Sequence, residues 1–288
     1  AFEACGVQTE VMPESDERTL YWGRKLTTGR ECYPCILTTG DMVRQIMDMP
    51  FDRERSAFFM PGGTGPCRFG QYNKFHRIVL DELGYSDVPI LSPNQDEDMY
   101  SQLKIVGGDY ARLAWQGIVA IDLLEKMLLE TRPYEKNAGE ADRIFLEWVL
   151  NVREALSRRK DLISVLREAR AAMSRIPVDL SNHRPKIGIV GEIYIRTNPF
   201  SNENLIREIE SLGGEVRLPP VTEWILYTNF TSRRNSAVNR NYMKLLSAVI
   251  NMFFQHKDEQ AMEAIFHGTV KDLEEPTIRQ TLHKASPY

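Results

Sequence analysis

Short apolar runs alternate with amphipathic segments over the first hundred residues. This alternation is typical of β-α-β units that build a parallel sheet. The period of the apolar positions predicts strands at Phe2–Met12, Ser56–Met60 and Val88–Leu91, and helices at Glu17–Leu26, Cys35–Met49 and Phe69–Leu83.

The pattern changes to long helical periodicity from Asp109 to Ser174, where apolar residues recur every three or four positions. A second β-α-β start follows Pro185. It comprises an expected strand at Lys186–Gly191, a helix at Asn202–Ser211 and a strand at Glu215–Leu218. The segment from Asn241 onward is predicted to be mostly helical.

These elements together predict an α/β protein with two Rossmann-like or flavodoxin-like parallel-sheet domains and a helical segment between them. The expected segments are an α/β domain at 1–108, a helical connection at 109–182, and a second α/β domain with a helical C-terminal tail at 183–288.

Composition argues against nucleic-acid binding and membrane spanning. The formal net charge of −4 over 288 residues gives no general electrostatic drive toward nucleic acid. No apolar run reaches the roughly 18 residues that a membrane span needs. The chain starts at Ala1 without a signal-peptide pattern, which suggests a piece of a longer polypeptide. Sparse cysteines with one C-x-x-C pair favour the reducing cytoplasm.

All four cysteines lie in the first quarter of the chain, at Cys5, Cys32, Cys35 and Cys67. A proline directly precedes Cys35 and also Cys67, each at the start of an expected helix. Backbone N–H groups and the helix dipole favour a thiolate there. Because strand ends and helix starts of an open α/β sheet meet in one crevice, we expect the cysteines to converge.

Several occupants fit such a group of thiols. An iron–sulfur cluster uses cysteine thiolates and is tuned by backbone N–H groups. A structural zinc also accepts four cysteines, although zinc sites usually pair two C-x-x-C knuckles. A redox-active cysteine pair would leave Cys5 and Cys67 unexplained. The thiols are alternatively ordinary buried side chains. The residues alone leave these alternatives open.

The segments that carry the cysteines form an ordered set of motifs: CGVQTEVMP at 5–13, GRECYPC at 29–35 and GTGPCRFGQY at 63–72. With GEIYIRTNPF at 191–200, they resemble the acyl-CoA dehydratase activase-related proteins. That group is related to 2-hydroxyacyl-CoA dehydratases, benzoyl-CoA reductases and double-cubane cluster proteins. The resemblance spans roughly residues 2 to 230, and the three cysteine motifs are its specific part.

The resemblance implies flavodoxin-like domains with an iron–sulfur cluster, [4Fe–4S] or related, in the crevice between them. It also implies an ATP-hydrolysing activator, separate or fused upstream, that delivers low-potential electrons. The usual three cysteines match Cys5, Cys32 and Cys67, and Cys35 departs from the pattern. A fourth thiolate would close the iron site that dehydratases leave open. Electron transfer is therefore favoured over dehydratase chemistry.

Other residues are candidates for the same crevice. Glu192, Tyr194 and Arg196 follow an expected strand, and Arg68 next to Cys67 would offset cluster charge. Each is alternatively a solvated polar residue. The glycine loop at 62–65 suits a close backbone approach to a cluster better than a phosphate, because it lacks the P-loop lysine.

A small basic group, Arg233, Arg234 and Arg240, would meet the phosphates of coenzyme A or would simply be solvated.

Three functions follow from these observations. The preferred one is an iron–sulfur component of an ATP-coupled, low-potential electron-transfer or reductive system in the cytoplasm. The first alternative is a non-catalytic binding or scaffold module with a structural zinc or no metal. The second is an acyl-CoA dehydratase or reductase subunit, for which Cys35 would be dispensable. A homodimer is compatible with each of the three.

Overall fold

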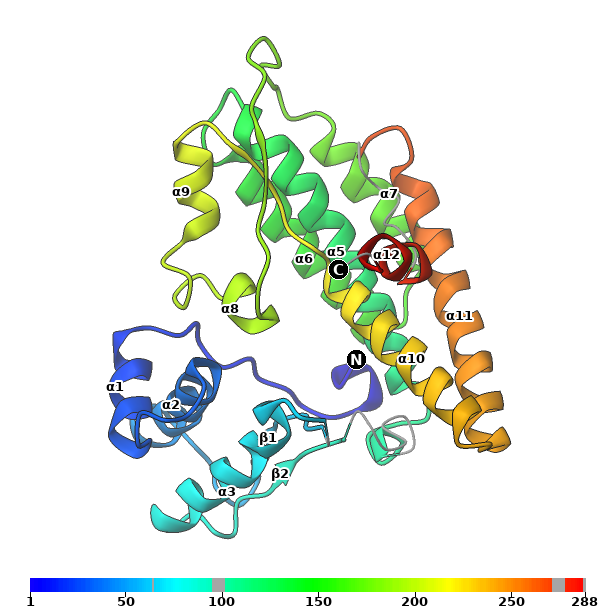
Figure 1. Cartoon of the computed structure of the whole chain (residues 1–288). Coiled ribbons are helices and arrows are strands. Elements are labelled where there is room, and N and C mark those ends of the chain that lie inside the picture. Colours follow the sequence, from blue (N-terminus) through cyan, green and yellow to red (C-terminus); the bar gives the residue numbers. More distant parts are fainter. Residues whose placement is uncertain (64, 95–101, 271–277, 287–288) are drawn as a thin grey trace. The chain divides into compact units, whose positions relative to one another are not determined.

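The chain is mostly helical, and the predicted pair of parallel-sheet domains is wrong. The computed structural model describes residues 1–63, 65–94, 102–270 and 278–286 (Figure 1). Helices take 60% of the chain and strands 5%, and the strands of the described residues form two short two-stranded parallel sheets. A doubly wound fold needs several adjacent strands, so the Rossmann-like prediction does not hold.

The described elements divide into two compact units that interleave along the chain. The helical unit comprises Ala1–Val7, Val106–Val190 and Leu205–Tyr288. The cysteine unit comprises Gln8–Ile105 and Gly191–Asn204, and it holds Cys32, Cys35 and Cys67. The consecutive segments predicted at 1–108, 109–182 and 183–288 stay a prediction.

The cysteine unit consists of three main helices and one short sheet. Its elements are α1 (Glu17–Leu26), α2 (Tyr33–Met47), β1 (Phe58–Phe59), the 3-10 turn η2 (Arg68–Gln71), α3 (Tyr72–Glu82), β2 (Ile90–Leu91) and α8 (Ile193–Thr197). β1 pairs in parallel with β2, with Phe58 opposite Ile90. The connection between them contains α3, so one β-α-β crossover of the predicted kind is present.

Close packing of α1 on α2 depends on two glycines. A Cβ added at Gly40 would lie 2.0 Å from the carbonyl oxygen of Thr19, and one at Gly23 would lie 2.2 Å from that of Ile36. The helix backbones therefore touch where these glycines meet. Met42, Val43 and Ile46 of α2 then pack with Val79 and Leu80 of α3 in the core of the unit.

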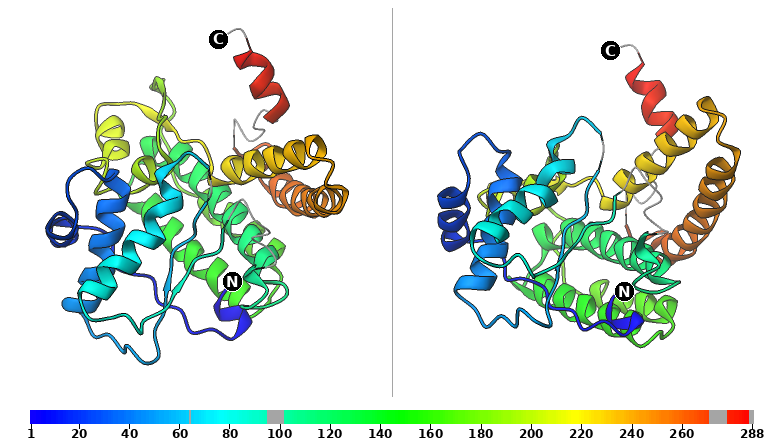
Figure 2. Two further views of the ribbon diagram at one scale, coloured as in Figure 1. Left: turned by 60° about the horizontal axis from the view of Figure 1, so that its bottom comes forward. Right: turned by 90° about the horizontal axis from the view of Figure 1, so that it is seen from below.

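The helical unit is built around α5 (Figure 2). Its elements are η1 (Glu3–Cys5), α5 (Tyr110–Thr131), η3 (Arg132–Tyr134), α6 (Glu140–Ser157), α7 (Leu162–Met173), β3 (Lys186–Gly188), α9 (Leu205–Ser211), β4 (Glu215–Arg217), α10 (Val221–Val238), α11 (Tyr242–Phe266) and α12 (Ile278–Ala285). The core buries Leu124 of α5, Leu166 of α7 and Phe266 of α11. β3 pairs in parallel with β4.

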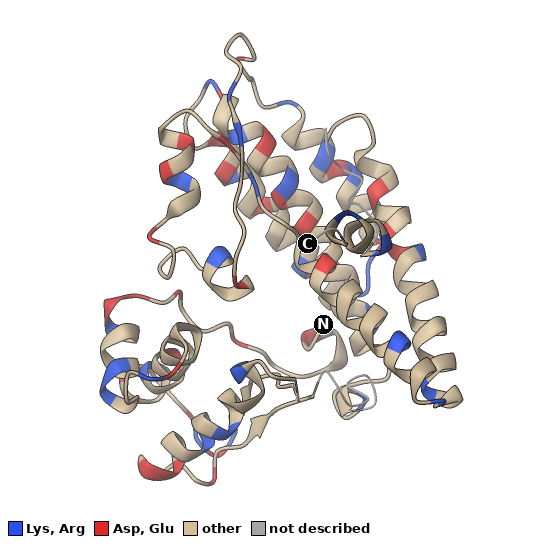
Figure 3. Cartoon of the chain, viewed as in Figure 1, with Lys and Arg blue, Asp and Glu red and all other residues tan. Residues whose placement is uncertain are grey.

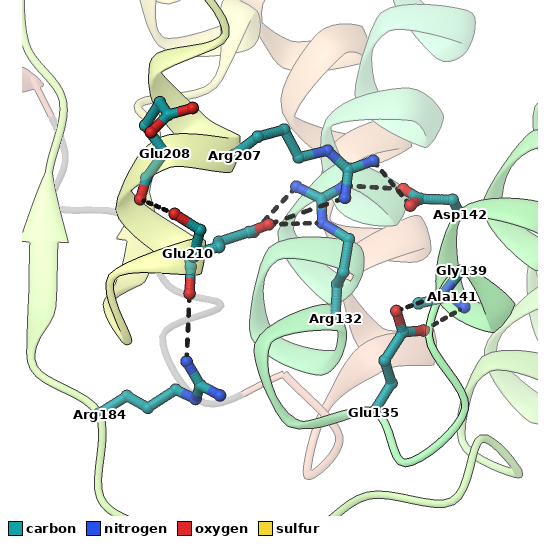
Figure 4. Close-up of polar contacts among 10 residues, drawn as sticks. Arg132, Glu135, Gly139, Ala141, Asp142, Arg184, Arg207, Glu208 and Glu210 are labelled. Atoms are coloured by element: carbon teal, nitrogen blue, oxygen red, sulfur yellow. Dashed lines mark hydrogen bonds and ion pairs between the residues drawn. The ribbon is translucent and has the colours of Figure 1, made fainter.

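A buried charge network fixes α9 to the helices (Figure 4). The guanidinium of Arg132 donates to Glu210 through Nε at 2.8 Å and Nη2 at 2.9 Å, and through Nη1 to Asp142 at 2.9 Å. Arg207 donates to the other oxygen of Asp142 at 2.7 Å. Because the side chains of Arg132 and Glu210 are only 9% exposed, this pairing is shielded from water.

The strand predicted at Phe2–Met12 is wrong for a local reason. The ring of Phe2 packs on Tyr110 with centroids 4.6 Å apart, and Glu3–Cys5 form the turn η1. Gly6 ends that turn at a φ of +80°, a conformation that glycine adopts without strain. The apolar start of the chain therefore packs on a helix instead of adding a strand.

Candidate functional site

The start of α2 places two cysteines at a helix N-terminus. Cys32 is the N-cap residue and makes no side-chain capping bond, and Pro34 lies in the first turn. Cys35 follows in that turn and is buried. The predicted position of Cys35 in a proline-led first turn is confirmed. α1 precedes this helix along the chain, in the predicted order.

Cys67 is an N-cap residue like Cys32, so its predicted place inside a proline-led first turn is wrong. It is the N-cap residue of η2, which leads into α3, and it is exposed. Nη1 of the next residue, Arg68, donates to the carbonyl oxygen of Arg30 at 2.8 Å. Since Arg30 lies two residues before Cys32, this bond ties the Cys67 turn to the Cys32 loop.

One phenol is influenced by three of the four cysteines. The hydroxyl of Tyr72, the first residue of α3, is hydrogen-bonded to Cys32. Burial raises the pKa of Tyr72, and the hydrogen bond to Cys32 and the negative potential of Cys32, Cys35 and Cys67 raise it further. Tyr72 therefore stays protonated and can donate to a thiolate. Cys32, Cys35 and Cys67, which all act on the pKa of Tyr72, are called the thiol site below.

The donor atoms of the thiol site are of the kind that a metal centre uses. Three thiols at two helix starts, beside a phenolic donor, suit a negatively charged iron–sulfur cluster. Their spacing is wider than that of a closed ligand set. Within residues 1–63, 65–94, 102–270 and 278–286, no three His, Cys, Asp or Glu side chains stand close enough to hold a metal ion. Burial also raises the pKa of Cys35 to about 11, which favours its neutral thiol.

Cys5 lies in the helical unit, in a different setting. Its Sγ donates to Oδ1 of Asp109 at 3.9 Å. A Cβ added at Gly107 would lie 2.6 Å from that sulfur, so the glycine makes room for the thiol. Arg159 pairs with Asp109 and donates to the carbonyl oxygen of Ala4 at 3.0 Å. The helical unit therefore fixes Cys5 through charged neighbours.

The segment that contains Glu192, Tyr194 and Arg196 belongs to the cysteine unit. Glu192 caps α8 by accepting from the backbone N–H of Ile195 at 2.9 Å. Nε of Arg196 is buried and has no hydrogen-bond partner among the described residues. Glu192 thus has a local structural role, and Arg196 has a polar atom that the described chain does not satisfy.

Tyr194 belongs to a polar network that the sequence did not indicate. Its hydroxyl lies 3.4 Å from Oγ of Ser15, and Ser15 donates to Asp41 at 3.0 Å. Nδ2 of Asn198 donates to both hydroxyls at 3.3 Å. Burial raises the pKa of Tyr194 to about 12 and raises that of Asp41. This network attaches residues 191–204 to α2 of the same unit.

The glycine loop at 62–65 lines a small cavity of about 240 Å³ in the cysteine unit. Gly62 and Gly63 form one wall, and Ser92 and Asn94 another. A Cβ added at Gly70 would lie 2.0 Å from the carbonyl oxygen of Gly63, so the loop is pressed against η2. The prediction for this loop also includes Thr64, which lies outside the described residues.

A larger cavity of about 780 Å³ lies in the helical unit, among α5, α10, α11 and α12. Leu226 and Phe230 supply apolar walls, and Arg233 of the predicted basic group reaches the lining. Burial and the neighbouring Glu263 raise the pKa of Glu259 in this lining to about 7. Sequence periodicity gave no signal for this cavity, because its residues come from four separate helices.

Comparison with known proteins identifies no relative: no protein-family model, curated protein or solved structure matches the chain. Among the described residues, no helix combines the length and the apolar character that crossing a lipid bilayer requires.

Proposed function

We propose that the chain is an iron–sulfur component of an ATP-coupled, low-potential electron-transfer or reductive system in the cytoplasm. The observation that carries the proposal is the thiol site, where Cys32, Cys35 and Cys67 at two helix starts all act on the pKa of Tyr72. An electron-transfer role needs cysteine ligands, a fixed scaffold and a nearby hydrogen-bond donor, and the thiols, the helix starts and the Tyr72 hydroxyl support these needs.

The chain's own residues would support such a cluster in distinct ways. Cys32 and Cys67, as N-cap residues, present thiols beside the N–H groups of two helix starts. The Tyr72 hydroxyl donates toward Cys32, and Arg68 adds positive charge beside Cys67. When bound, the cluster would accept and release single electrons. Cys5 as a fourth ligand remains a prediction from the motif resemblance.

Cysteine variants test the proposal. The protein and its Cys5→Ser, Cys32→Ser, Cys35→Ala and Cys67→Ser variants would be reconstituted anaerobically with iron and sulfide. We expect the unchanged chain to bind about four irons with broad absorption near 400 nm that dithionite bleaches. Cys32→Ser and Cys67→Ser should lose most of the iron. Full iron content in both of these variants would contradict the proposal.

The Cys35→Ala variant separates electron transfer from acyl-CoA dehydratase chemistry. A cluster that survives this change would have an iron without a cysteine at this position, as a dehydratase or reductase subunit requires. The raised pKa of Cys35 favours that alternative. Arg233, in the lining of the larger cavity of the helical unit, would meet a coenzyme A phosphate in this alternative. Loss of the cluster in Cys35→Ala would instead favour the closed, electron-transferring form.

The wide spacing of the thiols favours a different class, a scaffold or binding module that carries zinc or no metal. This alternative predicts a colourless protein after reconstitution with iron and sulfide. A zinc assay on the purified protein then separates its two forms. One zinc per chain that is lost in Cys32→Ser indicates a structural metal, whereas zinc-free protein with four reactive thiols indicates none.

A further inference from the structure

The first half of α11 carries an apolar stripe that the described chain leaves exposed. Tyr242, Leu246, Val249 and Phe253 follow one another at intervals of four, three and four residues, and they are 46–72% exposed. Met243, Ile250 and Phe254 lie beside them on the helix and are 46–77% exposed. These seven residues form one face of the helix, called the α11 stripe below.

The second half of α11 behaves differently. Met262, Ile265 and Phe266 are buried in the core with α5 and α7. Trp115 of α5 donates through Nε1 to the carbonyl oxygen of Gln255 at 3.0 Å, where the buried part of α11 begins. The helix is therefore anchored at one end, and residues before Gln255 are half-buried or exposed. A contiguous apolar face of this kind marks an interaction site.

The spacing of the stripe specifies the shape of its partner. Intervals of four and three residues place side chains along a seam into which another helix packs. From Tyr242 to Phe254 the stripe is about 18 Å long at the rise of an α-helix. A partner helix of three to four turns covers that length. Tyrosine, phenylalanine and methionine, which the stripe contains, are also enriched in protein–protein interfaces.

The charges around the stripe specify the partner's chemistry. Residues 224–257 contain five Lys and Arg and no Asp or Glu, although the chain as a whole has a formal net charge of −4. Figure 3 shows Lys and Arg but no acidic residues in this part of α10 and α11. Arg240 and Lys244 lie at one end of the stripe and Lys257 at the other.

A second copy of the chain fits these charges poorly. Antiparallel pairing of two α11 stripes would place Lys257 of one copy near Arg240 and Lys244 of the other. Parallel pairing would place like charges together at both ends. We therefore propose that the α11 stripe docks an amphipathic helix of a different protein, whose apolar face is flanked by Asp or Glu.

Two synthetic helical peptides test this proposal. Both have 21 residues with Leu at seam spacing, and they differ only in Glu or Lys at the flanking positions. Fluorescence anisotropy with the whole chain should show at least tenfold tighter binding of the Glu peptide. The preference should shrink at high salt because these charges are exposed.

Paired substitutions locate the binding face. Leu246→Gln with Phe253→Gln should weaken binding of the Glu peptide at least tenfold, and both side chains are exposed, so folding should be retained. The matched control changes Leu146→Gln and Leu150→Gln on α6, which are 59% and 62% exposed in the same unit. The control should bind as the unchanged chain does.

Four results would overturn the proposal. Equal affinity for the two peptides would show that acidic flanking residues do not determine binding. No binding of either peptide would show that the stripe does not dock a helix. Concentration-dependent dimerisation that the stripe substitutions abolish, measured by analytical ultracentrifugation, would make a second copy the occupant. Binding to phosphatidylcholine–phosphatidylserine vesicles that the same substitutions abolish would make a lipid surface the occupant.

Discussion

Tyr72 is the residue that links two separate cysteine motifs. The cysteine motifs predict that all four thiols converge, and this stays a prediction. Cys32, Cys35 and Cys67 all raise the pKa of the Tyr72 hydroxyl, whereas Cys5 belongs to the other unit. Tyr72 ends the GTGPCRFGQY motif, but no sequence pattern assigned a role to this tyrosine. Its buried environment depends on how α3 packs, which local sequence does not specify.

A Tyr72→Phe variant isolates the contribution of that hydroxyl. Removing the donor while keeping the ring should leave the fold intact. It should lower the reactivity of Cys32 toward oxidation, because the donor that would stabilise a thiolate at Cys32 is lost. Mass spectrometry after mild peroxide treatment would measure Cys32 oxidation in Tyr72→Phe and in the unchanged chain. Equal oxidation of Cys32 in both proteins would refute an activating role for the hydroxyl.

His76 makes the stability of the cysteine unit depend on pH. Burial lowers its pKa to about 4, and Nε2 lies 3.2 Å from Oγ1 of Thr38. The unfolded chain binds this proton near pH 6.5, so folding is most stable above that pH. Stability is lost as the pH falls toward 4, by at most about 1.4 kcal/mol per pH unit for one group.

The His76→Gln variant tests this pH dependence. Urea unfolding of both proteins at pH 7.5, 6 and 5 gives the slope of stability against pH. The slope should be smaller in the variant even if the variant is less stable at every pH. Identical slopes would show that another group is responsible.

At the scale of elements, sequence periodicity located most helices and strands. The helix at Glu17–Leu26 is confirmed at both ends, with Asp16 capping it through the N–H groups of Arg18 and Thr19. The strands expected near 58 and 90 are present but shorter. The contact between α1 and α2 was not predicted, because a glycine in a helix looks unfavourable until its close neighbour is known.

Gly40→Ala tests that contact. Alanine favours an isolated helix by about 1 kcal/mol, yet its Cβ would lie 2.0 Å from the carbonyl oxygen of Thr19. The steric cost of about 1–3 kcal/mol or more should win. Gly65→Ala is the control, since no atom lies within 4 Å of a Cβ there. Chemical denaturation should show clear destabilisation for Gly40→Ala alone; a stabilised Gly40→Ala would contradict the close approach.

Arg132→Gln tests the charge network that holds α9. Removing the guanidinium leaves Glu210 and Asp142 without their partner in a shielded position, so we expect a loss of about 3–5 kcal/mol. Arg143→Gln removes an exposed pair with Glu147 and should cost under about 0.5 kcal/mol. Similar unfolding midpoints for the two variants would show that the buried network is not stabilising.

For the molecule as a whole, the alternation of apolar runs along the sequence did not predict the fold class correctly. Each sheet stays two-stranded, and the apolar runs that suggested further strands are used elsewhere. Phe2 packs on Tyr110, and Ile189 lies in a cluster with Leu129 of α5. Strand pairing depends on contacts between distant residues, so alternation alone could not distinguish an extended sheet from short strands on helices.

The order of segments along the chain also did not show which residues belong to the cysteine unit. Residues 191–204 join the cysteine unit although the segments on both sides belong to the helical unit. The sequence singled out Tyr194 as a candidate for the cofactor crevice, and that role stays a prediction. It did not predict its partners Ser15 and Asp41, which lie more than 150 residues earlier.

The central claim is that the thiol site holds an iron–sulfur cluster, and its most direct test is the iron and acid-labile sulfide content of the anaerobically purified chain. The account predicts about four of each per chain. Protein free of iron and sulfide after anaerobic purification and reconstitution would contradict it. The three cysteines around Tyr72 would then be a structural feature of a binding module.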